Sequence, residues 1–144
     1  MLLERKNKKN LEMQMDIMKK KKRKDDQDFL YVLDFNGEFV KVGRGFDLNV
    51  RIDGLQWSSW TDNINILRVF TATHKEVYDF EQNMLSNLRQ KGFQYSTDWS
   101  YECFCNESLG TIREILDSID EKFIELYENI NPETKKGLDD NDKP

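Results

Sequence analysis

The fold of this chain is decided by residues 29–51, FLYVLDFNGEFVKVGRGFDLNVR. Segments 29–34 and 38–43 are largely apolar, and the Asn-Gly pair between them is a strong short-range signal for a β-hairpin. Asp47 then has the side chain expected of an N-cap, ahead of a short helix over 48–54. The stretch therefore predicts two antiparallel strands followed directly by a helix.

The register of this hairpin determines which side chains share a face. A two-residue turn at Asn36-Gly37 would place Tyr31 and Lys41 on opposite faces, because side chains alternate along a strand. A three-residue loop over 35–37, with Gly37 in the left-handed region, would instead pair Tyr31 directly with Lys41. We expect this second register, because it also gathers four aliphatic side chains on one face: Leu30, Val32, Val40 and Val42.

The middle of the chain continues with a loop, a strand and a helix. Residues 55–62 are expected to form a loop, and residues 64–71 read as a third strand. Capping-box spacing from Thr73 to Glu76 predicts the start of a helix, and Gly92 supplies its stop. One apolar stripe marks the inner face of this helix: Val77, Phe80, Met84 and Leu88.

The C-terminal part is expected to contain a short strand or edge segment over 101–105 and then one long helix. Apolar side chains at helical spacing predict this amphipathic helix, which ends before Pro132: Ile112, Ile115, Leu116, Ile119, Phe123, Leu126 and Ile130. We therefore expect an α/β fold in which a small three-stranded antiparallel sheet is flanked by helices, with the long amphipathic helix at the C-terminus.

Charge divides the chain into an arm, a body and a tail. The net charge is −5, yet residues 1–24 hold ten Lys or Arg and three acidic residues, which leaves −12 for the other 120 residues. We expect a basic arm over 1–26 that is disordered or partly helical, one domain over 28–131, and a disordered tail over 132–144.

The arm has three alternative roles. Its basic run, Lys20, Lys21, Lys22, Arg23 and Lys24, would attract nucleic-acid phosphates. In a eukaryotic host the same run would serve as a nuclear address, and otherwise it is a solvated tail.

Composition favours an intracellular protein that does not enter a membrane. No apolar run approaches the roughly 20 residues that a membrane span requires, and no secretory signal is evident. Cys103 and Cys105 lie too close together for an easy disulfide, which favours a reducing compartment.

The hairpin and the helix after it resemble the signature of the GIY-YIG nuclease family, specifically a Lys-Val/Ile-Gly branch common in phages and large DNA viruses. The resemblance is carried by Tyr31, by Lys41-Val42-Gly43 and by Arg51, and it extends to Glu102-Cys103-Phe104. It covers roughly residues 28–104. It implies a metal-dependent endonuclease that hydrolyses phosphodiester bonds in DNA, with Mg²⁺ or Mn²⁺ as cofactor.

The resemblance implies a task for each of five side chains. Tyr31 would position or deprotonate the attacking water, while Lys41 and Arg44 would contact DNA phosphates. Arg51 would bind the scissile phosphate, and Glu81 would hold the metal ion from the long helix. Such a set fits the reaction, because a divalent ion held by one carboxylate can place positive charge at a phosphate and Mg²⁺ keeps most of its waters.

Leu55 and Leu85 depart from the family pattern, which often has His or Tyr at the first position and tends to have His at the second in this branch. Three alternatives to the nuclease therefore stand. An Arg51–Glu81 salt bridge would be structural only. A second alternative is a non-catalytic module that binds nucleic acid or protein. The third is a virion or scaffold protein that self-associates through the long C-terminal helix.

Other conspicuous residues have simpler interpretations. His74 is expected to be an exposed residue of the first helical turn. Trp57, Trp60 and Trp99 either stack on unpaired bases or cover the edge of the core. A homodimer is a further hypothesis, because a nuclease with one site per chain would gain from pairing when it cuts both strands.

Overall fold

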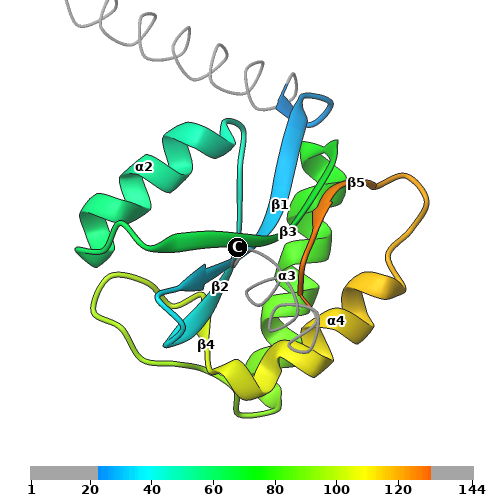
Figure 1. Ribbon diagram of the computed structural model, residues 1–144. Coiled ribbons are helices and arrows are strands. Elements are labelled where there is room, and N and C mark those ends of the chain that lie inside the picture. The colour runs from blue at the N-terminus through cyan, green and yellow to red at the C-terminus, as the bar shows by residue number, and fades with distance from the viewer. Residues whose placement is uncertain (1–22, 131–144) are drawn as a thin grey trace, which may run out of the picture.

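The computed structural model describes residues 23–130, which form a five-stranded antiparallel sheet with helices on both faces (Figure 1). The strand order is β4-β2-β1-β3-β5. In chain order the elements are β1 (Gln27–Phe35), β2 (Phe39–Gly45), α2 (Leu48–Ser59), β3 (Ile64–Thr73), α3 (His74–Gln90), β4 (Cys103–Phe104), η1 (Asn106–Ser108), α4 (Leu109–Asp117) and β5 (Ile124–Glu128).

β1 and β2 form the predicted hairpin, and its loop has three residues as expected. The loop covers 36–38 rather than 35–37, because Phe35 pairs with Phe39 and the two rings stack with their centroids 5.1 Å apart. Gly37 is left-handed, with φ 74°, as the sequence predicted.

The shift of the loop moves the pairing partners. Tyr31 pairs with Gly43, and Lys41 pairs with Leu33, so the predicted pairing of Tyr31 with Lys41 is wrong. Tyr31 and Lys41 still share a face, since the shift amounts to two positions on the partner strand and preserves the alternation of side chains. The aliphatic face formed by four residues is confirmed, because all of them lie in one core cluster: Leu30, Val32, Val40 and Val42.

The sheet has five strands and not three, because both of its edges are extended. β4 pairs with β2 through Val40–Phe104 and Lys41–Cys103. β5 pairs with β3 on the opposite edge. The short strand that the sequence suggested near residues 101–105 is therefore present, whereas β5 lies in a segment predicted to be helical.

The prediction of a long C-terminal helix is wrong. α4 ends at Asp117, and the chain returns as β5. The cause is Arg68 of β3, whose residue is only 2% exposed. Its Nε and Nη2 each donate to Glu125 of β5 at 2.7 Å, and its Nη1 donates to Asp117 at 2.9 Å. A buried guanidinium requires carboxylate partners, so this tertiary pairing overrides the local helical periodicity.

The sheet has a core on each face. On one side, in Figure 1, α3 and α4 cover Leu30, Val32 and their neighbours, with Met84 and Leu116 among the contributing residues. On the other side α2 and the loop before β4 cover a cluster around Leu33. This second cluster also contains Tyr31, Phe35, Phe39, Leu55 and Trp99.

The ends of the helices follow the expected capping with one difference. Asp47 caps α2 by accepting a hydrogen bond from Val50 N at 3.1 Å, and Thr73 caps α3 by accepting one from Glu76 N at 3.4 Å. α2 continues through Gly54 to Ser59, so the predicted loop over 55–62 is wrong for its first five residues. Gly54 has open space around it and an ordinary helical backbone, and therefore does not end the helix.

Parts of the predicted arm and tail lie outside the described residues. These are residues 1–22, which include Lys20, Lys21 and Lys22, and residues 131–144. Within residues 23–130, no helix has the length and the apolar character needed to cross a membrane.

Candidate active site

The candidate site is built around the ring of Tyr31, which lies over Gly43 of the neighbouring strand. A Cβ atom at Gly43 would be 2.5 Å from the Tyr31 hydroxyl and 2.6 Å from Cζ, so no other residue fits there without moving the ring. The far end of the ring therefore reaches β2. β4 pairs with the outer edge of β2 at Val40 and Lys41, and the carbonyl oxygen of Glu102 accepts from Val42 N at 3.1 Å. The hydroxyl therefore lies beyond the covered part of this edge.

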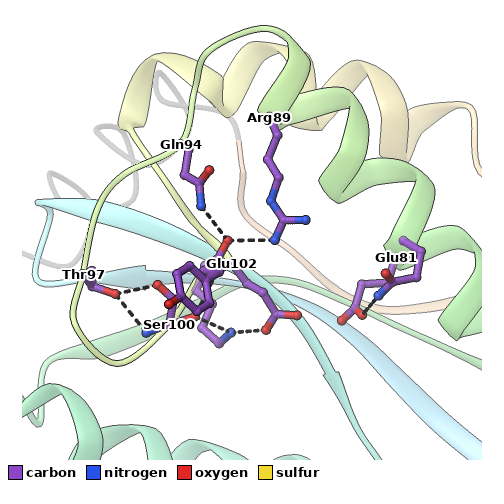
Figure 2. Close-up of polar contacts among 9 residues, drawn as sticks. Glu81, Arg89, Gln94, Thr97, Ser100 and Glu102 are labelled. Atoms are coloured by element: carbon purple, nitrogen blue, oxygen red, sulfur yellow. Dashed lines mark hydrogen bonds and ion pairs between the residues drawn. The ribbon is translucent and has the colours of Figure 1, made fainter.

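Glu81 projects from the inner face of α3 and is 3% exposed. Its Oε1 accepts a hydrogen bond from Gln82 at 3.1 Å, whereas its buried Oε2 has no hydrogen-bond partner among the described residues. Burial raises the pKa of Glu81 to about 7, and the negative charge of Glu102 adds to this shift; the Gln82 hydrogen bond and the charges of Arg44 and Lys41 oppose it. In Figure 2 the Glu81 carboxylate points toward that of Glu102.

Lys41 is paired with Glu102 at this site. Its Nζ lies 2.6 Å from Glu102 Oε1 and 3.3 Å from Ser100 Oγ, and its side chain is 5% exposed. The pairing follows from the sheet, because Lys41 lies opposite Cys103 in β4 and Glu102 is the residue just before it. The Lys41 ammonium therefore neutralises a carboxylate of the site.

The loop that carries Glu102 is held by a group of polar contacts visible in Figure 2. Arg89 Nη2 and Gln94 Nε2 donate to the carbonyl oxygen of Tyr101 at 2.9 and 3.1 Å. Thr97 Oγ1 donates to the Ser100 carbonyl and accepts from the Ser100 amide. These contacts fix the backbone on both sides of Ser100 and so position the carboxylate that follows.

Arg51 projects from α2 across Gly45, with its Nε 3.3 Å from the position that a Cβ at residue 45 would occupy. Its guanidinium makes no hydrogen bond or ion pair within residues 23–130, so the alternative of an Arg51–Glu81 salt bridge is wrong for the part of the chain that the structure describes. Arg51 lines two adjoining clefts, of about 440 Å³ and about 350 Å³. The lining of the larger cleft includes Lys41, Arg51, Leu55, Arg89, Trp99 and Glu102. An unpaired guanidinium in an open cleft is suited to bind a phosphate.

Arg44 lies apart from this cleft. Its Nε donates to Asp28 at 2.6 Å, its Nη2 lies 3.4 Å from the other oxygen of Asp28, and its guanidinium covers the ring of Phe46 at 4.8 Å. Alternation along β2 explains this position, because Arg44 faces the same side as Val42 and not the side of Lys41. The charge of Arg44 nevertheless acts on Glu81, whose pKa it lowers.

Asp28 is a polar centre that was not predicted from the sequence. It is fully buried and lies 2.8 Å from Nδ1 of His74 as well as beside Arg44. His74 is therefore half-buried and bonded, and the prediction of an exposed residue is wrong. The available signal was the position of Asp28, two residues before Leu30 on an apolar face of β1, where a carboxylate requires a partner.

Of the predicted basic run, Arg23 and Lys24 lie within the described residues. Both are exposed, and the guanidinium of Arg23 covers Phe46 at 4.7 Å. Arg23 therefore lies beside Arg44, whose guanidinium covers the same ring, and neither Arg23 nor Lys24 lines the two clefts of Arg51.

Tyr31 is held in its neutral form by its surroundings. Burial raises the pKa of its hydroxyl well above the usual range; the charge of Arg51 opposes this shift, and the carboxylates of Glu102 and Glu81 add to it. At neutral pH the hydroxyl therefore keeps its proton, and it is suited to orient a water molecule by hydrogen bonding.

The carboxylates of the site fit a hard divalent cation. Glu81 offers an oxygen without a partner among the described residues, and Glu102 lies close enough to affect the pKa of Glu81. Residues 23–130 contain no cluster of three or more His, Cys, Asp or Glu that could hold a metal. One or two carboxylates suit Mg²⁺ or Mn²⁺, which keep several waters, whereas zinc sites use three or four protein ligands.

No protein-family model, curated protein or solved structure matches this chain. The resemblance to GIY-YIG nucleases therefore stays a prediction, and the site must be judged on its own geometry.

Proposed function

We propose that this protein is a metal-dependent endonuclease that hydrolyses phosphodiester bonds in DNA with a site of GIY-YIG type. The observation that carries the proposal is the buried Oε2 of Glu81, which has no partner within residues 23–130. A buried carboxylate oxygen without a hydrogen bond destabilises the folded protein. Buried carboxylates with a raised pKa are concentrated at active sites, where catalysis requires them.

Each residue of the site has a distinct task in this proposal. Arg51 binds the scissile phosphate from α2, and the neutral Tyr31 hydroxyl orients the attacking water. Glu81, together with Glu102, holds a Mg²⁺ or Mn²⁺ ion, which supplies positive charge at the phosphate when it is bound. Lys41 holds the Glu102 carboxylate in place.

The chemical step is a hydrolysis. The water oxygen forms a bond to phosphorus, and the bond from phosphorus to the leaving sugar oxygen breaks. The proton of the water passes to solvent in the open cleft, and the leaving oxygen takes a proton from solvent.

A non-catalytic nucleic-acid-binding module is the second candidate, and one observation favours it. Leu55 is buried and lines the cleft. An apolar side chain at this position cannot transfer a proton. Phosphate binding through Arg51 would survive this change even if cleavage did not. The virion or scaffold hypothesis lacks such support, because residues 118–130 do not continue the helix on which it relied.

Supercoiled plasmid nicking in Mg²⁺ and in Mn²⁺ tests the proposal. We expect the wild-type protein to convert supercoiled to nicked circles, EDTA to stop the reaction, and Arg51→Ala to reduce its rate at least about 100-fold, as removal of one transition-state donor does elsewhere. Arg113→Ala, on α4, is the matched control and should nick normally. Nicking that survives Arg51→Ala would contradict the proposed site. Binding without nicking on plasmid, single-stranded and branched DNA would support the second candidate.

A further inference from the structure

Two tryptophans at the C-terminal end of α2 are almost fully exposed. Trp57 is 80% exposed and Trp60 is 90% exposed. The third tryptophan behaves differently, because Trp99 packs against Phe35 with the ring centroids 5.3 Å apart. The two roles considered for the tryptophans, covering the edge of the core and stacking on unpaired bases, therefore apply to different residues. Trp99 covers the core edge, whereas the indoles of Trp57 and Trp60 are free to meet a ligand.

The backbone at Trp60 is also unusual. Trp60 ends α2 in the left-handed conformation, with φ 59° and ψ 26°, which favours Gly or Asn over a large side chain. Stability alone would thus select a different residue at this position, and it would not leave an indole in water. A tryptophan retained under both penalties indicates that the indole has a use.

Both indoles line one open cleft of about 500 Å³, which they share with Gln56, Thr61 and Asp62. Among the described residues that line it, none is Lys or Arg, and Asp62 is acidic. The cleft therefore repels phosphate, whereas its two aromatic faces and its amide and hydroxyl groups suit a neutral, flat ring with polar edges. A nucleobase has this chemistry.

The same helix carries Arg51, which connects this cleft to the proposed active site. Trp57 follows Arg51 by six residues, which is about 9 Å along the helix axis and about 120° around it. A strand whose phosphate is bound at Arg51 can therefore bring a base to the indoles only by following the surface of α2 for a few nucleotides. Bases inside a duplex are stacked on one another, so only an unpaired base can make this contact.

We propose that Trp57 and Trp60 form a stacking site for unpaired bases, and that the substrate is DNA with a single-stranded segment beside the cleaved bond. The assignment of the substrate rests on the proposed nuclease function. The stacking site itself is a binding property that can be measured without cleavage.

Equilibrium binding of the full chain in EDTA tests this inference. The probes are a short fluorescent oligo(dT), an abasic oligonucleotide of the same length, and a blunt duplex. The abasic strand keeps the phosphates and removes the bases. We expect the wild type to prefer oligo(dT) over the abasic strand about tenfold or more, since each stacked base contributes on this scale. The double variant Trp57→Ala/Trp60→Ala should lose this preference and bind the duplex as before.

Three further variants separate stacking from other effects. Trp57→Phe/Trp60→Phe keeps two aromatic faces and should keep most of the preference for oligo(dT). This result would show that the double alanine variant loses the preference because the rings are missing and not because it misfolds. Tyr127→Ala removes an exposed aromatic ring from β5, on the opposite side of the molecule from α2 in Figure 1, and should change nothing. Arg51→Ala should weaken binding of both single strands equally, because phosphate contacts do not depend on bases.

Two results would overturn the inference: a wild type that binds oligo(dT) and the abasic strand equally, or a double alanine variant that keeps the preference. A concentration-dependent dimer that is lost in the double alanine variant, with no preference for bases, would assign the indoles to a second copy of the chain. A base preference in a protein that never nicks DNA would refute the nuclease and leave the stacking site standing.

Discussion

At Gly43 the backbone of β2 passes directly beneath the Tyr31 ring, and at Gly45 it passes beneath the Arg51 side chain. Both glycines leave room for side chains of the candidate site that come from other elements. The sequence pattern Lys-Val-Gly therefore has a physical meaning in this chain. Its glycine holds the ring, while its lysine, on the same face, holds Glu102.

Gly43→Ala should destabilise the fold by about 1–3 kcal/mol, because the added methyl group forces the buried Tyr31 ring to move. Gly54→Ala is the matched control. Nothing lies within 4 Å of a Cβ at that position, which is in the middle of α2, so this change should stabilise the protein by about 0.5–1 kcal/mol. Urea unfolding measures both. Equal effects of the two substitutions would contradict the close approach at Gly43.

Glu81 should make stability fall as pH rises. Its pKa is raised from 4.5 to about 7 in the folded state, so the folded protein keeps a proton that the unfolded chain releases between these values. Its contribution to stability is thus lost as pH rises through this window. The side chain in Glu81→Gln has no proton to lose. The free energy of unfolding of this variant should therefore exceed that of the wild type by on the order of 2 kcal/mol at pH 8, and by much less at pH 5.

Urea unfolding at the two pH values checks this prediction, with Glu114→Gln on the exposed side of α4 as control. The control should leave the pH dependence unchanged. A stability difference between wild type and Glu81→Gln that is the same at pH 5 and pH 8 would show that the Glu81 carboxyl titrates normally.

At the scale of elements, Arg68 holds three segments of the chain together: β3, the end of α4 and β5. Its guanidinium contacts Asp117, Glu125 and, at 4.0 Å, Glu128. The Arg68 guanidinium is buried and has carboxylates around it. Its pairing with them favours the return of the chain to the sheet after α4. β5 then forms one edge of the sheet, with Leu126 and Tyr127 exposed.

Arg68→Ala should cost about 3–5 kcal/mol, because it removes the cation that the neighbouring carboxylates require. We expect β5 to detach first, since its own residues are mostly exposed. Amide hydrogen exchange checks this: protection should fall over Ile124–Glu128 and persist in β1. Arg113→Ala, on α4, is the control. Uniform loss of protection across the sheet would contradict a local role for Arg68.

The hairpin and α3 could be predicted from the sequence because their signals are local. Asn36-Gly37 lies between two apolar strands, and Thr73 has its capping partner Glu76 three residues away. The segment after α4 could not be predicted in this way. Its apolar residues fit a helix as well as a strand, and the choice depends on Arg68, which lies about 50 residues earlier in the chain.

At the scale of the whole molecule, the candidate site likewise combines residues that the sequence predicted with partners that it did not predict. Motif spacing singled out Tyr31, Lys41, Arg51 and Glu81. Lys41 and Arg51 line one cleft, whereas Tyr31 and Glu81 are buried and line neither cleft of Arg51; the charge of Glu102 acts on both of them. The spacing of the motif did not predict which side chains these residues, or Arg44, would pair with. Glu102 reaches Lys41 across 61 positions, and Asp28 takes Arg44 away from the cleft. Such pairs depend on the sheet register, whose prediction was wrong by two positions, and on the pairing of β4 with β2, because the sequence predicted a short strand over 101–105 but not its partner.

Charge is unevenly spread over the whole molecule, and this should be visible in DNA binding. Residues 1–22 hold eight of the 22 Lys and Arg, while the chain is acidic after residue 24. Deletion of residues 1–22 should weaken DNA binding and flatten its dependence on salt, because fewer counterions are released. Single-turnover cleavage at saturating protein should stay unchanged. Binding measured by anisotropy over a range of salt concentrations checks this, and an unchanged salt slope would contradict it.

The measurement that tests the central claim most directly is single-turnover cleavage of end-labelled DNA by wild type and by Glu81→Gln, in saturating Mg²⁺ and with equal amounts of bound DNA. The proposed site predicts that the substitution reduces the cleavage rate at least about 100-fold while the variant still binds DNA and unfolds cooperatively. Cleavage by Glu81→Gln at the wild-type rate would contradict the account, because the buried carboxylate on which it depends would then have no part in the reaction.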